Sequence, residues 1–205
     1  VQGAAAALNT IDGSTDANIT GTDYTVAQLK TINDKVGGTI TLADSTAVAL
    51  TGSAGDLVDA LAGTFASAHT GEVKITGTYN TTQLKSINSG TAGALHLDDR
   101  TVALSGTAAN VKAALAGTFT TDKTHTGVVT IADNTNSTVT ATDITDISTA
   151  KGSGNINITS AVTLSGSGSE VKAAAAALNT IHGSTAASVT GTNYNVSQLK
   201  AINDK

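Results

Sequence analysis

Histidine has the widest chemical range of the residue types in this chain, since it can act as an acid, a base or a metal ligand. His69 and His125 each begin a His-Thr-Gly triplet at equivalent positions of an internal repeat. Because the intervening chain separates such equivalents, we expect two turn residues ahead of strands and no shared metal site. His96 is expected on the outward side of a strand. His182 stands where the first repeat copy has Asp12, so the position tolerates exchange.

Four aspartates that follow predicted strands form a second candidate group: Asp44, Asp98, Asp99 and Asp133. A column of carboxylates along one edge of a repeat structure could hold Ca²⁺. Asp also favours turns, because its side chain bonds to nearby backbone groups. The calcium-binding pattern Gly-Gly-x-Gly-x-Asp is absent, so we favour turn residues and keep calcium as the alternative.

The serines lack a catalytic setting. No Gly-x-Ser-x-Gly segment is present, and no glycine-rich run carries the lysine of a phosphate-binding loop. An enzyme needs one asymmetric constellation, whereas each distinctive residue here is repeated or replaced at its equivalent position. We therefore expect that the chain is not an enzyme and has no catalytic, cofactor-binding or metal-binding residues.

Composition excludes further classes of protein. The 205 residues include no Cys, Pro, Met or Trp, which rules out disulfide scaffolds and cysteine-based metal sites. The formal net charge of −5 leaves no electrostatic footprint for nucleic acid. No run approaches the roughly 20 apolar residues of a membrane-spanning helix. Aromatic residues make up only 2% of the chain, which favours a thin core of Ala, Val, Ile and Leu.

Internal repeats dominate the sequence. Residues 1–35 and 171–205 are identical at 25 of 35 positions without a gap, so one long period is complete when the second copy begins. A shorter unit lies inside this period: YTVAQLKTIN (24–33) recurs as YNTTQLKSIN (79–88) and YNVSQLKAIN (194–203). A degenerate copy lies around Asp143, between the last two. A second unit, DLVDALAGTF (56–65) and NVKAALAGTF (110–119), alternates with the first.

Two hydrophobic periods predict strands and helices. Short runs that alternate apolar and polar residues are typical of strands with one buried face. Their expected inward residues are Ile40, Leu42, Val73, Ile75, Leu95, Leu97, Ile156 and Ile158. Helical spacing relates Val26, Leu29 and Ile32, and also Leu57, Leu61 and Phe65.

The ends of these helices carry recognisable residue types. We expect Thr25, Thr81 and Asn195 to be N-caps. Left-handed residues are expected at the C-terminal ends, at Asn33, Asn88, Asn203, Gly63 and Gly117.

Alternating strands and short helices, at about 27–28 residues per turn, predict an α/β right-handed repeat solenoid of about seven coils. Its parallel strands are expected to form one sheet. The alternatives are a β-solenoid with helical corners and, third, a string of small β-sandwich domains. As to domains, we expect residues 1–205 to be a single uncapped solenoid segment from a longer array. Its double coils of about 55–60 residues are nested in a 170-residue period (1–170, restarting at 171).

The combined units ALAGTF, HTGxVxI, YxxxQLKxIN and VALSG resemble the Ala/Thr/Gly-rich repeat regions of giant bacterial cell-surface proteins, those of marine cyanobacteria in particular. The resemblance covers the whole chain. It implies a secreted, extracellular protein of the bacterial cell surface that acts as a stalk, filament or surface-layer element, and it brings no catalytic residues with it.

Three classes of function therefore stand side by side. The leading hypothesis is a structural segment that self-associates with further copies of the same repeat or with neighbouring chains. The second is an adhesin or other binding module, with calcium-stabilised and glycan-binding versions. An enzyme such as a polysaccharide-degrading β-helix is disfavoured by the scarcity of aromatic platforms. Ice binding is also disfavoured, because the Thr-x-Thr pair at Thr39 and Thr41 becomes Glu72 and Lys74 in a matching strand.

Overall fold

A computed structural model describes residues 13–45 and 48–205, and over these residues the chain is mixed α/β. It contains seven helices: α2 (Val26–Asn33), α3 (Ala54–Leu61), α4 (Thr81–Gly90), α5 (Ala108–Leu115), α6 (Ala141–Ala150), α7 (Gly168–Ala177) and α8 (Val196–Asn203). Successive helices begin at nearly constant intervals, as the sequence spacing predicts, with one longer interval between α5 and α6.

Twelve short strands form four sheets of three strands each in the described chain, and not the one sheet that was expected. Two sheets have the strand orders β1-β2-β4 and β3-β5-β6. Their strands are β1 (Ala17–Ile19), β2 (Thr39–Leu42), β3 (Leu50–Ser53), β4 (Thr64–Phe65), β5 (Val73–Thr76) and β6 (Leu95–Leu97).

The other two sheets have the orders β10-β8-β7 and β12-β11-β9. Their strands are β7 (Leu104–Gly106), β8 (Val129–Ile131), β9 (Thr138–Thr140), β10 (Ile156–Ile158), β11 (Thr163–Ser167) and β12 (Ala186–Thr190). All eight strand pairs are parallel. Each pair has one helix between its two strands in the chain, so every pairing is a strand–helix–strand crossover.

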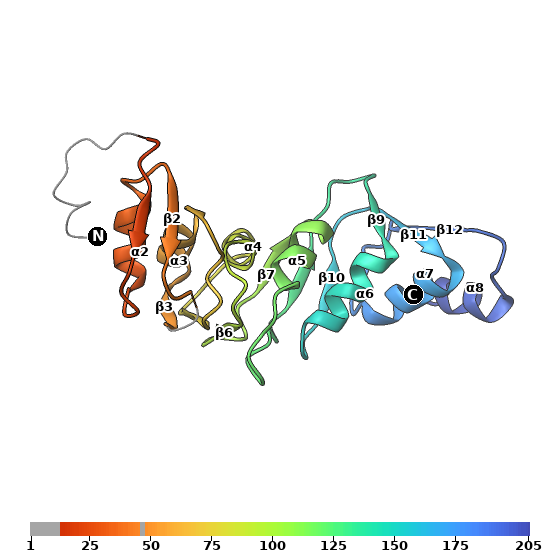
Figure 1. Cartoon of the computed structure of the whole chain (residues 1–205). Helices are drawn as coiled ribbons and strands as arrows, with labels where there is room; N and C mark the ends of the chain where they lie inside the picture. The colour runs from red at the N-terminus through yellow and green to blue at the C-terminus, as the bar shows by residue number, and fades with distance from the viewer. Residues whose placement is uncertain (1–12, 46–47) are drawn as a thin grey trace. The chain divides into compact units, whose positions relative to one another are not determined.

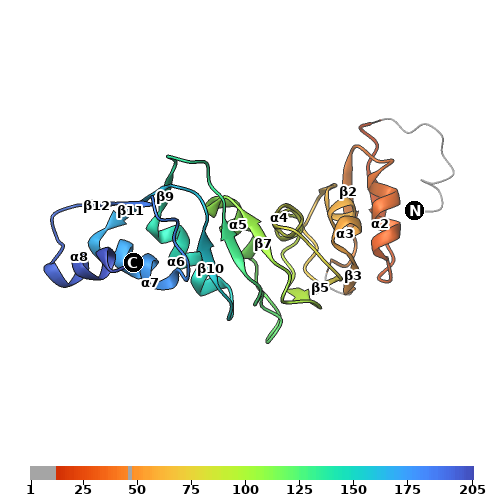
Figure 2. The ribbon, with the colours of Figure 1, turned by 180° about the vertical axis from the view of Figure 1, so that it is seen from behind.

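The chain divides into two compact units. The first comprises the described residues up to Asp99 together with Gly117–Thr124, and the second comprises Arg100–Ala116 together with His125–Lys205. In the first unit α2 packs against α3 beside β2 and β3 (Figure 1). In the second unit α6 packs against α7, and β11 runs next to β12, as the view from behind also shows (Figure 2).

The inward-facing residues predicted from the two-residue period are confirmed. All eight are buried, from Ile40 and Val73 with no exposed surface to Leu42 at 8%. On the helices Val26, Leu29 and Ile32 are buried, and so are Leu57 and Leu61. The prediction for Phe65 is wrong: α3 ends at Leu61, and Phe65 lies half-buried in β4.

Every described helix begins after a Ser, Thr or Asn whose side chain accepts a hydrogen bond from the backbone N–H of the third helical residue. Thr25 and Asn195 are N-caps as predicted. Thr81 is not, because Asn80 caps α4 in a reciprocal pair with Gln83 and leaves Thr81 as a buried first-turn residue. These caps satisfy N–H groups that have no partner inside the helix.

The predicted left-handed residues at the helix ends are wrong. None of the five has a positive φ, and Asp34, the C-cap of α2, has φ −62°. The Asn33 side chain bonds to α3 instead, where its Nδ2 donates to the Asp59 carbonyl over 2.8 Å. Gly63 is required by this contact, because a Cβ there would lie 2.6 Å from Asn33 Oδ1 and 2.8 Å from Ile40 Cδ1.

Gly63→Ala is expected to destabilise the protein by about 1–3 kcal/mol, since the added methyl group would have to displace Asn33 or Ile40. Gly55→Ala is the matched control, in the first turn of α3, the helix that Gly63 follows. The nearest atom to a Cβ at Gly55 is 4.0 Å away, so this change is expected to stabilise α3 by about 0.5–1 kcal/mol. Urea unfolding of both variants measures the difference, and equal effects of the two would contradict the packing role of Gly63.

Candidate functional site

His69 is a core residue of the first unit: it lies ahead of β5, as predicted, but forms a β-bridge with Thr91 and not a turn. Its side chain is fully buried. Its Nδ1 lies 3.1 Å from the Tyr24 hydroxyl, the two rings meet edge to face with centroids 6.1 Å apart, and Tyr24 also donates to the Asp44 carbonyl over 3.0 Å. The His69 carbonyl accepts from Ala92 N–H over 2.8 Å. His69 therefore joins three segments of the chain.

Burial sets the protonation of His69. It lowers the pKa of the imidazole, and a hydrogen bond with the Val48 backbone opposes this only in part. Burial also raises the pKa of the Tyr24 hydroxyl. A neutral histidine beside a neutral tyrosine is suited to packing and hydrogen bonding.

His125 repeats this behaviour in the second unit. It is fully buried, and burial together with the nearby charge of Lys151 lowers its pKa to about 4. Its carbonyl accepts from Gly152 N–H over 2.8 Å. Lys151 is itself only 5% exposed, and its Nζ donates to the carbonyls of Ser153 and Gly154 over 2.7 and 2.5 Å. The buried ammonium is thus held by backbone oxygens and not by a carboxylate.

A group of ionisable side chains gathers around β5 and β6 in the first unit. His96 lies between two carboxylates, with Nδ1 3.5 Å from Glu72 Oε1 and Nε2 3.4 Å from Asp98 Oδ1. Lys74 Nζ is 3.1 Å from the same Asp98 oxygen, and Thr120 donates to Glu72 over 3.0 Å. The outward placement predicted for His96 is confirmed. Both carboxylates already have cationic or hydroxyl partners, so the group is an ion-paired sheet surface.

The predicted aspartate column divides into separate contacts. Asp98 belongs to the ion-paired group, and Asp133 accepts from the backbone N–H of Ala108, the first residue of α5, over 2.7 Å. The Asp44 carbonyl accepts from Tyr24. Over residues 13–45 and 48–205, no three His, Asp or Glu side chains are grouped so that they could hold a metal ion. Calcium binding stays a prediction of the sequence.

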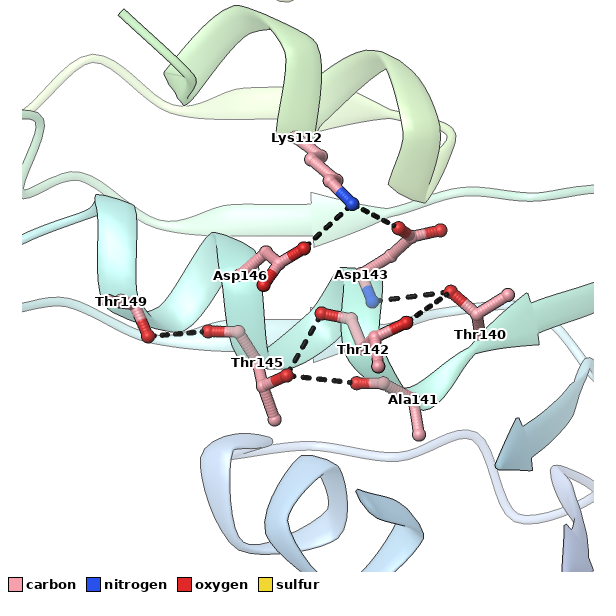
Figure 3. Close-up of polar contacts among 8 residues, drawn as sticks. All are labelled: Lys112, Thr140, Ala141, Thr142, Asp143, Thr145, Asp146 and Thr149. Atoms are coloured by element: carbon pink, nitrogen blue, oxygen red, sulfur yellow. Dashed lines mark hydrogen bonds and ion pairs between the residues drawn. The ribbon is translucent and has the colours of Figure 1, made fainter. Parts of the chain in front are cut away.

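Two lysines bridge neighbouring helices in the same way, one in each unit. Lys112 on α5 contacts Asp143 Oδ1 at 2.9 Å and Asp146 Oδ2 at 2.7 Å on α6 (Figure 3). Lys30 on α2 contacts Asp56 and Asp59 on α3. In both cases the two carboxylates are separated by two intervening residues and therefore share one helix face. These bridges were not predicted from the sequence. The pattern that indicates them is a lysine on one helical segment and an Asp-x-x-Asp pair on the next.

These bridges alter the acidity of their members. Hydrogen bonds to Asp146 and Asp143 raise the pKa of Lys112, and the bond to Asp59 raises the pKa of Lys30. Partial burial acts to raise the pKa of Asp143, but hydrogen bonds from Lys112 and Thr140 hold it below its ordinary value. Lys30 and Lys112 therefore keep their positive charge at neutral pH, and Asp143 keeps its negative charge, so the bridges join the helices electrostatically.

A shallow hollow in the second unit lies between α7, β12 and α8. Val171, Ala175 and Ile202 line its apolar part. His182, at its rim, is exposed, and its Nδ1 accepts from Ser184 N–H over 3.2 Å. Its lining also includes the polar residues Thr185 and Lys205.

Comparison with protein-family models, with curated proteins and with solved structures found no match to this chain. Within the described part of the chain, no helix is both long enough and apolar enough to span a membrane.

Stability is expected to fall between about pH 6.5 and pH 4 because of the two buried histidines. Their folded-state pKa values are lowered, so the unfolded chain takes up protons first and the folded state loses stability as the pH falls. For His125, whose pKa falls from 6.5 to about 4, the loss reaches about 3–4 kcal/mol, at about 1.4 kcal/mol per pKa unit.

Urea midpoints measured across this pH range, for the parent and for His125→Asn, test the effect. The variant is expected to have a flatter profile, whereas His182→Asn, which changes an exposed residue, should keep the parent profile. A parent stability independent of pH from 7 to 4.5 would contradict the buried neutral state.

The Lys112 bridge is expected to contribute a salt-sensitive coupling between α5 and α6. A double-mutant cycle with Lys112→Ala and Asp146→Ala should show coupling at low ionic strength that shrinks in concentrated NaCl. The matched control is the more exposed pair of Lys200 on α8 and Asp204, the C-cap of that helix, at 2.8 Å, for which a smaller coupling is expected. Equal coupling in the two cycles would contradict a joining role for Lys112.

Proposed function

We propose that this chain is a structural repeat segment: a right-handed α/β solenoid that acts as a stalk, filament or surface-layer element of a large extracellular bacterial protein. The observation that carries the proposal is the uniform crossover of the described strands. Each hydrogen-bonded pair is parallel and encloses one helix, so neighbouring coils are built alike. A chain wound from like coils supplies length and repeated surface.

The use made of the chemically versatile side chains supports a structural role. His69 and His125 are buried in the core, Lys30 and Lys112 join helices, and Asp133 bonds to a helix N-terminus. These residues stabilise contacts between segments of the chain. The resemblance to repeat regions of giant bacterial surface proteins supports the extracellular setting.

Chain-length scaling in solution scattering tests the solenoid. Two further copies of the 170-residue period, inserted in frame, should raise the radius of gyration nearly in proportion to chain length. A compact globule would grow with the 0.38 power of length, which amounts to roughly 1.4-fold for this change. Growth near that lower value would overturn the proposal.

Antibody labelling of cells tests the proposed extracellular location. An antibody raised against the 205-residue chain should bind intact, unpermeabilised cells of the source organism. Binding only after permeabilisation would overturn the extracellular placement, whatever the scattering result.

A further inference from the structure

The helix α8 repeats α2 in sequence but not in burial. Val26, Leu29 and Tyr24 are 7%, 0% and 4% exposed. Their equivalents in the later repeat copy, Val196, Leu199 and Tyr194, are 83%, 42% and 47% exposed. Three of the four large hydrophobic side chains that are exposed in the described chain thus lie on one repeat copy. We call this surface, made by Tyr194, Val196, Leu199, Lys200 and Asn203, the α8 face.

The partner of each of these side chains can be read from the first copy. Tyr24 donates to the Asp44 carbonyl and lies against His69, Lys30 pairs with Asp56 and Asp59, and Asn33 donates to the Asp59 carbonyl. A Cβ built on Gly52 would be 3.4 Å from Val26 Cγ1. All of these partners come from one continuous stretch, residues 36–71. It contains β2, β3, α3 and β4.

The strand beside α8 shows the same difference. In the first copy β1 pairs with β2, in the register Ala17 to Ile40, and Ala17 and Ile19 are each 6% exposed. Its equivalent β12 pairs with β11, and within the described residues no strand pairs with its other edge. Ala187, the equivalent of Ala17, is exposed. One contact does not transfer, because Asp16, which accepts from Thr39 N–H, becomes Ala186.

We propose that the α8 face and the second edge of β12 form an acceptor surface for a strand–helix segment with the sequence of residues 36–71. The inference rests on the repeat architecture of the proposed function. It adds to that function a specific surface and a specific occupant. Charge agrees with this occupant, since Lys200 stands where Lys30 meets two aspartates. The bond that Lys200 itself makes is to Asp204, the C-cap of α8, at 2.8 Å.

Extension of the chain tests the proposal. A copy of residues 36–71 is joined directly after Lys205, with a scrambled segment of the same composition as the control. The added segment has no tyrosine, and Tyr24 and Tyr79 are buried, so iodide-quenchable tyrosine fluorescence reports Tyr194. The native extension should remove most of this quenching and slow amide exchange in α8 at least tenfold. Equal quenching and exchange with both extensions would overturn the proposal.

A charge exchange tests the register of docking. In the extended chain Lys200→Glu should speed amide exchange in α8, and changing the added copies of Asp56 and Asp59 to Lys should restore its protection. In the 205-residue chain the same Lys200→Glu substitution removes only the pair with Asp204, so it should change exchange in α8 by less than it does in the extended chain. An extension that protects α8 equally with and without Lys200→Glu would overturn the predicted pairing.

The concentration dependence of the unextended chain separates this occupant from a second copy. Quenching of Tyr194 should not change with protein concentration. If it decreases as the chain dimerises, a second copy occupies the surface and the proposal is wrong. The outcome is independent of the scattering test, because a compact particle could still bury Tyr194 under the added segment.

Discussion

Seven helices of eight to ten residues depend on what lies beneath them, because helices this short are marginal by themselves in water. Their support is a thin layer of Leu, Ile and Val between helix and strand, with alanines such as Ala60 and Ala114 fully buried. An N-cap fixes the start of each helix. The helix α8 resembles α2 in sequence but is not covered by a following segment, and its apolar residues are exposed.

The strands form several small sheets because the chain between two helices contributes to two of them. Between α2 and α3 it forms β2 and β3, which belong to different sheets. Between α3 and α4 it forms β4, which returns to the sheet of β2, and β5, which joins β3. The sequence predicts the strands but not this division between sheets.

A feature could be predicted where nearby residues in the sequence determine it, and could not where it depends on contacts between distant segments. Burial of Ile75 and Leu97 could be predicted because a two-residue period determines which face of a strand each residue occupies. The roles of His69 and Lys112 could not be predicted, since both depend on side chains from a distant part of the sequence. The N-cap of α4 was placed one residue late because Asn80 and Thr81 are both competent caps, and the reciprocal bond with Gln83 selects Asn80.

The lysine bridges affect how a chain of near-identical segments avoids pairing the wrong segments during folding. Lys30 and Lys112 each have aspartate partners on the next helix. In the related segment 56–65 the position of Lys112 is occupied by Val58, and the helix that follows has Gln83 and Ser86 in place of the two aspartates. If the chain mispaired by one segment during folding, a lysine would meet a neutral neighbour and an acidic pair would lack its cation. The charge pairs therefore disfavour the pairing of a segment with the wrong neighbour. The hydrophobic residues, which are alike in the repeated segments, do not distinguish between neighbours.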